Sequence, residues 1–264
     1  MNFTNKVVWI TGASSGIGKA LAIELSKLDT KLILSARNEE QLIAVKQACK
    51  NSDAIKILPL DLEHYLSLHE KAIEAIKWFG RVDILVNNAG VSQRSLVKDT
   101  HISVDKRIMD INYLGTVALT KAILPHFIEN NKGQFVITTS IVGKIGTPLR
   151  SSYAASKHAL HGFFDSLRAE NHSNNITVTL VCSGFVNTNV SINALTGDGT
   201  PQNKMDTATN KGIAPERFAK IMVKAIFKKK EEVYIAGAKE KLGVYAKRFY
   251  PTLLSKMIRK LRVT

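Results

Sequence analysis

The chain has 264 residues, of which 45% are hydrophobic and 22% charged, a balance that excludes disordered and low-complexity proteins. Its lysines and arginines exceed its aspartates and glutamates by 15, which is unusual for a soluble enzyme. Cys49 and Cys182 are too few for a disulfide framework or a four-ligand zinc site, so we predict a reducing, cytoplasmic location and no metal site. No segment reaches the ~18 apolar residues of a membrane span, and a strand-like run from Val7 predicts no signal peptide or N-terminal anchor helix.

Short apolar runs rich in β-branched residues alternate with segments of helical periodicity along the chain. The predicted strands cover residues 7–10, 31–34, 55–58, 82–86, 134–138 and 176–181. The predicted helices include residues 19–28, 39–49, 66–79 and 154–170. Because nearly continuous apolar strands are typical of sheets buried on both faces, we predict an α/β protein with a parallel sheet between two helical layers. Residues 183–215, rich in Gly, Thr, Asn and Ser, are predicted to form a long irregular loop that is either functional or disordered.

A glycine-rich turn, TGASSGIG at residues 11–18, connects the first predicted strand to the first predicted helix. Gly12, Gly16 and Gly18 allow the backbone to turn sharply and let a phosphate approach bare N–H groups at the positive end of the helix. A glycine triplet alone is a weak signal, but its place between strand and helix favours dinucleotide binding.

The end of the second predicted strand indicates which dinucleotide is preferred. An acidic residue there would bind an adenosine ribose diol, but the sequence is Ser35-Ala36-Arg37, with a guanidinium that can pair with a 2′-phosphate. NADP is therefore favoured over NAD, with a solvated loop position as the alternative for Arg37. After the third strand, Asp61 either binds the adenine amine or is a plain surface carboxylate.

Tyr153 and Lys157 are four residues apart in a predicted helix, so their side chains share a face. An ammonium beside a phenol would lower the pKa of the phenol, which could then exchange a proton with a carbonyl oxygen during hydride transfer. Ser140 follows the fifth predicted strand, where ligands bind in parallel α/β sheets, and its hydroxyl could orient the carbonyl.

In these motifs the chain resembles the short-chain dehydrogenase/reductase family, from Lys6 to about Tyr234. The shared features are the glycine-rich turn, Asn87-Asn88-Ala89-Gly90 after the fourth strand, Asn112, Ser140 and the Tyr153-Ala154-Ala155-Ser156-Lys157 segment. The resemblance implies a single-domain, Rossmann-like three-layer sandwich with a doubly wound parallel sheet of about seven strands. It also implies a catalytic tetrad with Tyr153 as acid/base, Ser140 holding the carbonyl, Lys157 binding the nicotinamide ribose and tuning the phenol, and Asn112 holding a water in the proton path.

The same resemblance implies a cofactor cleft, with one departure from the family pattern. The residues expected to contact the cofactor are Gly12, Ser14, Ser15, Gly16, Ile17, Gly18, Arg37, Asp61, Leu62, Asn88, Ala89, Gly90, Tyr153, Lys157, Val186 and Thr188. The family usually has Pro-Gly after the sixth strand, where this chain has Ser183-Gly184. The fixed φ of proline is lost there, which puts the rigidity of the loop in doubt more than the chemistry.

The C-terminal segment 239–264 is basic and amphipathic, and its eight lysines and arginines against Glu240 give it a charge of +7. Apolar residues recur at helical spacing on both sides of Pro251. Such a segment can lie on an anionic membrane surface or can pack on a neighbouring subunit, and both interpretations remain open. No nucleic-acid motif accompanies the charge, so nucleic acid is not a predicted partner. Together with the run Ile141 to Glu170, which has Arg150-Ser151-Ser152 before Tyr153, this basic C-terminus also resembles the membrane-associated branch of the family that acts on lipophilic carbonyls.

These observations predict a catalytic domain at residues 1–238, including the loop 183–215, and a C-terminal extension at 239–264. The substrate pocket is expected from residues 91–96, 142–149 and the loop from Phe185 onward, where apolar residues either face a lipophilic substrate or pack the loop down. Those residues are Ile145, Leu149, Phe185, Val190, Ile192 and Leu195. The expected function is an NADP-dependent oxidoreductase that interconverts a lipophilic secondary alcohol and its ketone or aldehyde. The alternatives are a catalytically idle NADP-binding sensor and a membrane-surface scaffold; the family resemblance implies a homodimer or homotetramer.

Overall fold

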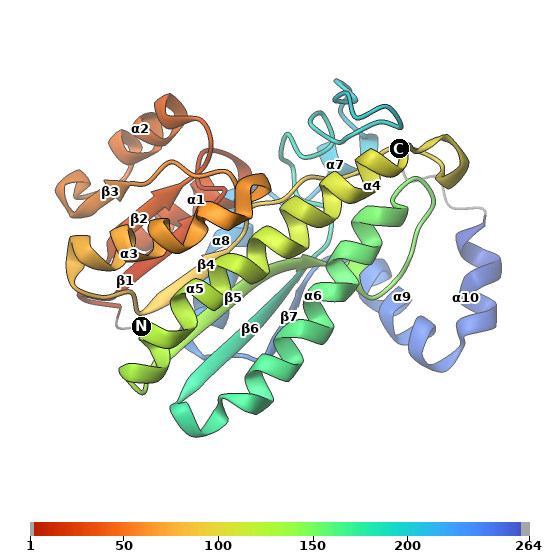
Figure 1. Ribbon diagram of the computed structural model, residues 1–264. Helices are drawn as coiled ribbons and strands as arrows, with labels where there is room; N and C mark the ends of the chain where they lie inside the picture. Colours follow the sequence, from red (N-terminus) through yellow and green to blue (C-terminus); the bar gives the residue numbers. More distant parts are fainter. Residues whose placement is uncertain (1–2, 260–264) are drawn as a thin grey trace.

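The computed structural model describes residues 3–259, and in this range seven strands form one sheet in the order β3-β2-β1-β4-β5-β6-β7 (Figure 1). Every neighbouring pair is parallel, so the predicted sheet type is confirmed. The strands are β1 (Val7–Thr11), β2 (Lys31–Ser35), β3 (Ile55–Ile57), β4 (Ile84–Asn87), β5 (Gly133–Ser140), β6 (Ile176–Ser183) and β7 (Glu232–Ile235). The last strand was not among the predicted runs because it is short and half-buried at the edge of the sheet.

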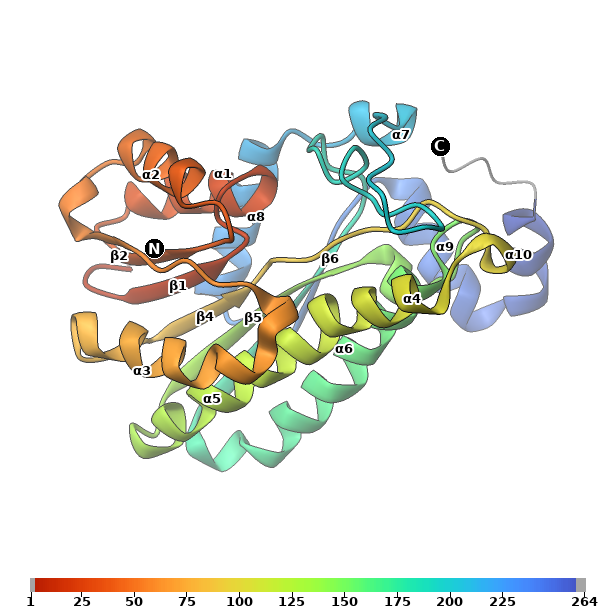
Figure 2. The ribbon, with the colours of Figure 1, turned by 45° about the horizontal axis from the view of Figure 1, so that its top comes forward.

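Helices connect the strands and cover both faces of the sheet (Figures 1 and 2). They are α1 (Gly16–Ser26), α2 (Glu39–Ala48), α3 (Leu68–Phe79), α4 (Ile102–Met109), α5 (Gly115–Glu129), α6 (Ser151–Glu170), α7 (Thr207–Asn210), α8 (Pro215–Phe227), α9 (Ala238–Phe249) and α10 (Pro251–Ile258). Between α4 and α5 the chain forms a π-helical turn, Asp110–Leu114.

Two hydrophobic cores lie on opposite faces of the sheet because successive strand residues point to opposite sides. In β1, Val8 and Ile10 pack in one core with α1, α2 and α8, whereas Val7 and Trp9 pack in the other with α3, α5 and α6. This three-layer arrangement explains why the strands read as continuous apolar runs.

The predicted irregular loop at 183–215 is ordered by backbone pairing with the segment after β4. Leu195 donates to the carbonyl of Ser92 at 2.9 Å and accepts from the N–H of Arg94 at 2.8 Å. The loop also contains the short helix α7, which was not predicted from the sequence. The loop was predicted to be either functional or disordered, and its backbone hydrogen bonds and helix contradict the disordered alternative.

The carboxyl ends of the central strands bring polar residues to one edge of the sheet, as the parallel topology requires. Ser140 at the end of β5 is level with Ser183 at the end of β6 in the strand register. Helices α9 and α10 lie beside this end of the sheet (Figures 1 and 2). Leu254 of α10 is buried there against Ile141 and Ile145, in a small third core.

Candidate active site

A cavity of about 1300 Å³ lies at this edge, between the glycine-rich turn, the segments after β4 and β5, the loop after β6, and helices α9 and α10. All the predicted cofactor-contacting residues line it except Gly18, and Ser140 lines it as well. Asn112 does not, because it lies wholly buried behind the cavity wall.

The glycine-rich turn has the backbone shape that close approach to a phosphate requires. Gly12 and Gly16 have φ angles of +65° and +52°, which residues with a Cβ rarely adopt. At Gly18 a Cβ would lie 2.2 Å from the carbonyl oxygen of Gly12, so this glycine serves helix–strand packing instead of lining the cavity. The amide of Asn88 donates to the carbonyls of Thr11 and Gly12 at 3.1 and 3.3 Å and so ties the turn to β4. The turn therefore fits a dinucleotide pyrophosphate.

At the end of the cavity beside β2, Arg37 is exposed and lines the cavity two residues after the strand. Ser35 is wholly buried and does not line the cavity; its hydroxyl accepts a hydrogen bond from the indole of Trp9 at 2.8 Å. Asp61 also lines the cavity, and its Oδ1 accepts from the N–H of Glu63 at 3.0 Å. Asp61 thus caps the turn that follows β3 with one oxygen.

Asn112 sits in the π-helical turn, and its side chain points at the segment after β4. Its Oδ1 accepts from the N–H of Val91 at 2.8 Å, and its Nδ2 donates to the carbonyl of Val91 at 2.9 Å and to Ser156 Oγ at 3.0 Å. Gly115, directly after this turn, allows the chain to pack closely against Leu62, because a Cβ there would lie 2.4 Å from the carbonyl oxygen of Leu62. One side chain thus joins the segment after β4 to α6.

Ser140, Tyr153 and Lys157 converge on the cavity from β5 and α6. Ser140 Oγ donates to the carbonyl of Ser183 at 3.2 Å and accepts from the N–H of Val142 at 3.2 Å. The Lys157 ammonium is buried, donates to the carbonyl of Thr138 at 2.9 Å, and lies 5.9 Å from the centre of the Tyr153 ring. The shared face predicted for Tyr153 and Lys157 is therefore present.

The predicted lowering of the Tyr153 pKa is wrong for this structure. Burial raises the pKa of the phenol, and the opposing hydrogen bond with Ser140 and charges of Arg150 and Arg94 do not overcome that effect. Burial also lowers the pKa of the Lys157 ammonium to about 8. Desolvation is the largest effect on the pKa of each group, and the ammonium donates its hydrogen bond to a backbone carbonyl.

A buried ionic cluster next to these residues was missed from the sequence. Asp206 accepts from Arg94 Nε at 2.8 Å and lies 3.6 Å from a terminal nitrogen of Arg150, whose guanidinium also lies 5.5 Å from the ring centre of Phe185. Both arginines line the cavity. The cluster joins the segment after β4, the N-terminus of α6 and the long loop, and no local pattern signals a contact between residues 112 positions apart.

The apolar residues predicted to form a substrate pocket line the cavity only in part. Of the six apolar residues named in advance, Ile145, Phe185, Val190 and Leu195 line it, whereas Leu149 and Ile192 do not. A large part of the wall comes from α9, α10 and the residue between them, which the sequence predicted to form a separate extension. This part of the wall includes Leu242, Gly243, Ala246, Tyr250, Leu253, Leu254, Met257 and Ile258.

The loop after β6 is held firmly although it lacks the usual proline. Ser183 donates its hydroxyl to the carbonyl of Thr139 at 3.0 Å, and the N–H of Gly184 donates to the carbonyl of Ile235 at 2.9 Å. Glu240 of α9 accepts from the N–H of Phe185 at 2.9 Å. Side-chain and backbone hydrogen bonds thus replace the constraint of a proline ring, and one of them comes from the C-terminal helices.

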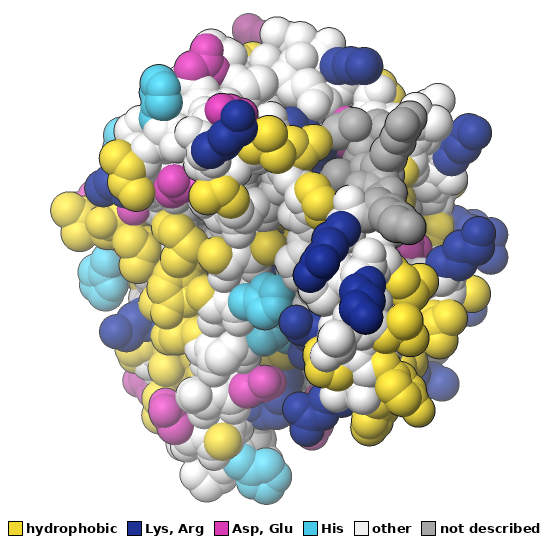
Figure 3. All heavy atoms as spheres, turned by 90° about the vertical axis from the view of Figure 1, so that its right-hand side faces the viewer, with side chains coloured by type: hydrophobic (Ala, Val, Ile, Leu, Met, Phe, Trp, Pro, Cys, Tyr) yellow, Lys and Arg dark blue, Asp and Glu magenta, His cyan; other side chains and the backbone are white. Residues whose placement is uncertain are grey.

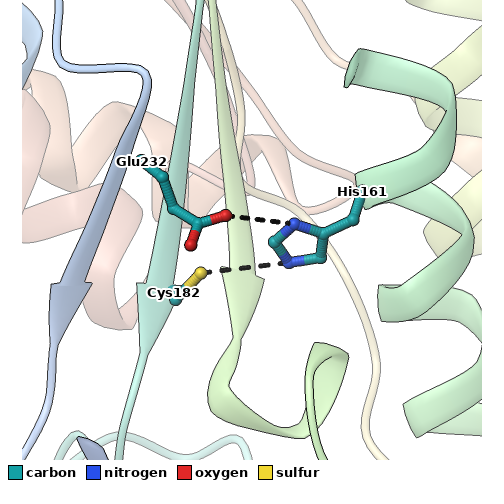
Figure 4. A group of neighbouring side chains, drawn as sticks. All are labelled: His161, Cys182 and Glu232. Atoms are coloured by element: carbon teal, nitrogen blue, oxygen red, sulfur yellow. Dashed lines mark hydrogen bonds and ion pairs between the residues drawn. The ribbon is translucent and has the colours of Figure 1, made fainter. Parts of the chain in front are cut away.

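His161, Cys182 and Glu232 form a second polar cluster outside the cavity (Figure 4). His161 Nδ1 lies 3.6 Å from Glu232, and its Nε2 lies 3.9 Å from Cys182 Sγ. Glu232 is already paired with Lys144 at 2.8 Å and accepts from the hydroxyl of Tyr234. These residue types can bind a metal ion, but the Lys144 ammonium paired with the Glu232 carboxylate opposes binding of a further cation. Burial lowers the pKa of His161 to about 4 and raises that of Cys182 to about 12, so both are neutral near pH 7.

Comparison with known proteins agrees with this architecture. A family model described as short chain dehydrogenase matches residues 6–198. Dehydrogenase/reductase SDR family member 7B of Xenopus tropicalis is 42% identical over 256 residues, which cover 94% of this chain and 82% of that protein. Human dehydrogenase/reductase SDR family member 7 is 43% identical over 256 residues, covering 94% of this chain and 75% of that protein. A short-chain dehydrogenase from Streptomyces avermitilis superposes with a TM-score of 0.81 at 26% identity, covering 99% of this chain and 100% of that chain.

The chain therefore belongs to the short-chain dehydrogenase/reductase family, and it is an NAD(P)-dependent oxidoreductase. The family resemblance seen in the sequence motifs and the Rossmann-like fold are both confirmed. Within residues 3–259, no helix combines the length and the apolar character needed to cross a membrane.

The pKa of His161 predicts how stability depends on pH. Between its ordinary value of 6.5 and about 4, the unfolded chain binds a proton at this histidine and the folded chain does not, so the free energy of unfolding falls as the pH falls. We expect this group to contribute a loss of about 2–3 kcal/mol between pH 7 and pH 4. Urea unfolding at pH 7 and pH 4 should show that the free energy of unfolding falls less between these pH values in His161→Gln than in the native chain. Replacement of the exposed His172 by Gln is the control, and an equal pH dependence in H161Q and the native chain would contradict the assignment.

Proposed function

We propose that the protein is an NADP(H)-dependent oxidoreductase that interconverts a lipophilic secondary alcohol and its ketone or aldehyde. The observation that carries this proposal is the convergence of Ser140, Tyr153 and Lys157 on a cavity whose other wall is the apolar face of α9 and α10. A nicotinamide cofactor bound in the glycine-lined half of the cavity would supply or accept the hydride. The remaining half would hold the substrate.

Each polar residue has a distinct role in this proposal. Tyr153 is the acid/base: a phenol that keeps its proton at neutral pH can donate it to the carbonyl oxygen that becomes an alkoxide. Ser140 orients that oxygen through its hydroxyl, which Val142 and Ser183 fix in place. Lys157 binds the nicotinamide ribose and supplies positive charge near the phenol, while Asn112 holds a water in the proton path and fixes the segment that carries Gly90 and Val91.

The preference for NADP rests on Arg37. Its guanidinium follows β2 at the mouth of the adenosine site, where a carboxylate would instead accept hydrogen bonds from a ribose diol. A planar guanidinium binds a phosphate dianion through charge-assisted hydrogen bonds, which an unphosphorylated ribose does not offer.

The surface of α9 and α10 supports a lipophilic substrate and peripheral contact with a membrane. Tyr245 and Phe249 are 59% and 69% exposed, and Leu253 and Met257 are exposed while also lining the cavity. Figure 3 views the molecule from this end and shows hydrophobic and basic side chains together at the surface. The described cations of this segment are Lys239, Lys241, Lys247, Arg248, Lys256 and Arg259; the predicted Lys260, Leu261 and Arg262 lie outside the described residues. An anionic lipid surface would attract these cations and give an apolar substrate a short route to the site.

Three further parts of the proposal come from the sequence and the family. The protein is a homodimer or homotetramer in the cytoplasm, with residues 239–264 as its membrane-facing extension beyond a catalytic domain at 1–238. The alternative function, an idle NADP-binding sensor or membrane scaffold, predicts binding of NADPH without turnover of any carbonyl. An NADPH oxidation assay across steroids, retinoids, sugars, quinones and acyl ketones separates the two.

Replacement of Tyr153 by Phe removes the acid/base hydroxyl and keeps the ring. We expect turnover to fall by about 10²- to 10⁴-fold because proton transfer is lost, while NADPH affinity stays near that of the native chain. Steady-state kinetics and NADPH fluorescence titration measure the two quantities. Tyr65→Phe, at a half-buried tyrosine outside the cavity, is the control. Near-native turnover in Y153F would refute the mechanism.

Reversal of charge at Arg37 tests the cofactor preference. Arg37→Asp should weaken NADPH binding by about 10- to 100-fold and improve NADH binding, because a charge-assisted phosphate contact is replaced by repulsion. Arg217→Asp makes the same charge change at an exposed position on α8 outside the cavity and should leave the ratio of the two affinities unchanged. If R37D and the native chain show the same ratio, Arg37 does not select the cofactor.

Membrane contact is tested at two exposed aromatic residues that do not line the cavity. The double variant Tyr245→Ser with Phe249→Ser should reduce co-flotation with phosphatidylserine-containing vesicles by about 10-fold or more, because two apolar anchors are lost. Leu66→Ser with Ile102→Ser removes two exposed apolar side chains elsewhere and is the control. Equal flotation of the Y245S/F249S variant and the native chain would refute the lipid contact.

A further inference from the structure

The first turn of α6 does not receive a cap from its own N-cap residue. Arg150 occupies that position, and its side chain makes no capping hydrogen bond because a guanidinium has no acceptor for an N–H group; it is directed at Asp206 and the ring of Phe185. The first N–H groups of a helix have no partners within the helix, and a buried N–H without a partner is costly. Ala154 is the first residue of α6 to bond back to Arg150, at 2.8 Å, so the preceding N–H groups need acceptors from elsewhere.

Gln93, from the segment after β4, supplies that acceptor. Its Oε1 accepts from the N–H of Ser152 at 2.8 Å and from the N–H of Tyr153 at 3.3 Å. These are the second and third N–H groups of the helix, the ones that an N-cap side chain ordinarily binds. Gln93 is fully buried, so no water competes for these bonds.

The orientation of the Gln93 amide follows from its partners. Backbone N–H groups require an oxygen, and the amide Nε2 is directed at two hydroxyls, those of Thr100 and Ser151, each at 3.2 Å. The backbone around Gln93 is fixed from both sides, because Arg94 pairs with Leu195 of the long loop and Val91 is held by Asn112. The amide is therefore a rigid acceptor.

We propose that Gln93 is a positioning residue for catalysis, acting as a remote N-cap that fixes the backbone of Tyr153. Gln93 does not line the cavity, so it acts only through the helix that it caps. Together with Asn112, which bonds Ser156 one turn later, it holds the catalytic helix against the segment after β4 at two points. The inference rests on the proposed role of Tyr153 as acid/base.

Replacement of Gln93 by Leu, a residue of similar size, removes the acceptor and tests the proposal. We expect kcat to fall by about 10- to 100-fold with little change in NADPH affinity, because a small displacement of the phenol is enough to cause such a loss. Amide hydrogen exchange at Ser152 and Tyr153 should accelerate by about 10-fold. Gln134→Leu is the matched control: Gln134 is also a buried glutamine, bonded to Thr179 and Ile226 at the opposite end of β5 from Ser140. Q134L should lose stability without either effect.

Gln93→Glu is the conservative variant, since a carboxylate keeps the acceptor at a helix N-terminus that favours negative charge. It should restore slow exchange at Ser152 and Tyr153 and recover most of kcat, with a pH–rate profile shifted upward by the new charge near the phenol.

Should Q93L fail to fold, Gln93→Asn, whose acceptor is one methylene too short, takes its place. Native exchange and native kcat in the folded variant would overturn the proposal, as would equal losses of kcat in Q93L and Q134L. If the native chain turns over no carbonyl, the proposed function fails, while faster exchange in Q93L alone still establishes the cap.

Discussion

The side-chain amide of Asn112 is the contact on which the rest of the site depends. It bonds both backbone groups of Val91 and the hydroxyl of Ser156, and it is wholly buried. Leaving a buried polar group without its partner costs about 1–3 kcal/mol, and of these groups the Ser156 hydroxyl keeps a second bond, to the carbonyl of Tyr153 at 2.8 Å. The π-helical turn that presents the amide is consistent with this role, because such turns widen a helix locally and are frequent at functional sites. Together with Gln93, this contact fixes the segment after β4 relative to the helix that carries Tyr153.

Burial governs the electrostatics of the same region. The ammonium of Lys157 and the phenol of Tyr153 are both withdrawn from water, so each is biased toward its neutral form. For the proposed reduction this is the useful state of the phenol, because the neutral hydroxyl is the proton donor. In the oxidative direction a phenolate is needed, and the positive charges of Arg150 and Arg94 favour it because they act to lower the pKa of the phenol.

The sequence was most informative where a function is encoded by neighbouring residues. The glycine-rich turn, the parallel strands and the Tyr153–Lys157 face follow from local spacing, and the structure places them as expected. Asn112 was identified only through the family resemblance, since a single amide in a helix has no distinctive pattern. The ionic cluster of Arg94 and Asp206 and the cap from Gln93 depend on contacts between distant segments, which hydrophobic periodicity does not encode. The pKa of Tyr153 was mispredicted for a related reason: the spacing gives the neighbour of the phenol but not the depth of its burial.

Helices α9 and α10 close one side of the cavity although they add no strand to the sheet and belong mainly to a small core of their own. The residues proposed for hydride chemistry lie in the first two thirds of the chain, whereas the wall of the cavity is completed by its last part. A change in this terminal helical pair therefore alters the shape of the cavity without altering Ser140, Tyr153 or Lys157. The hydrogen bond from the N–H of Phe185 to Glu240 limits such changes, because it connects α9 to the loop after β6.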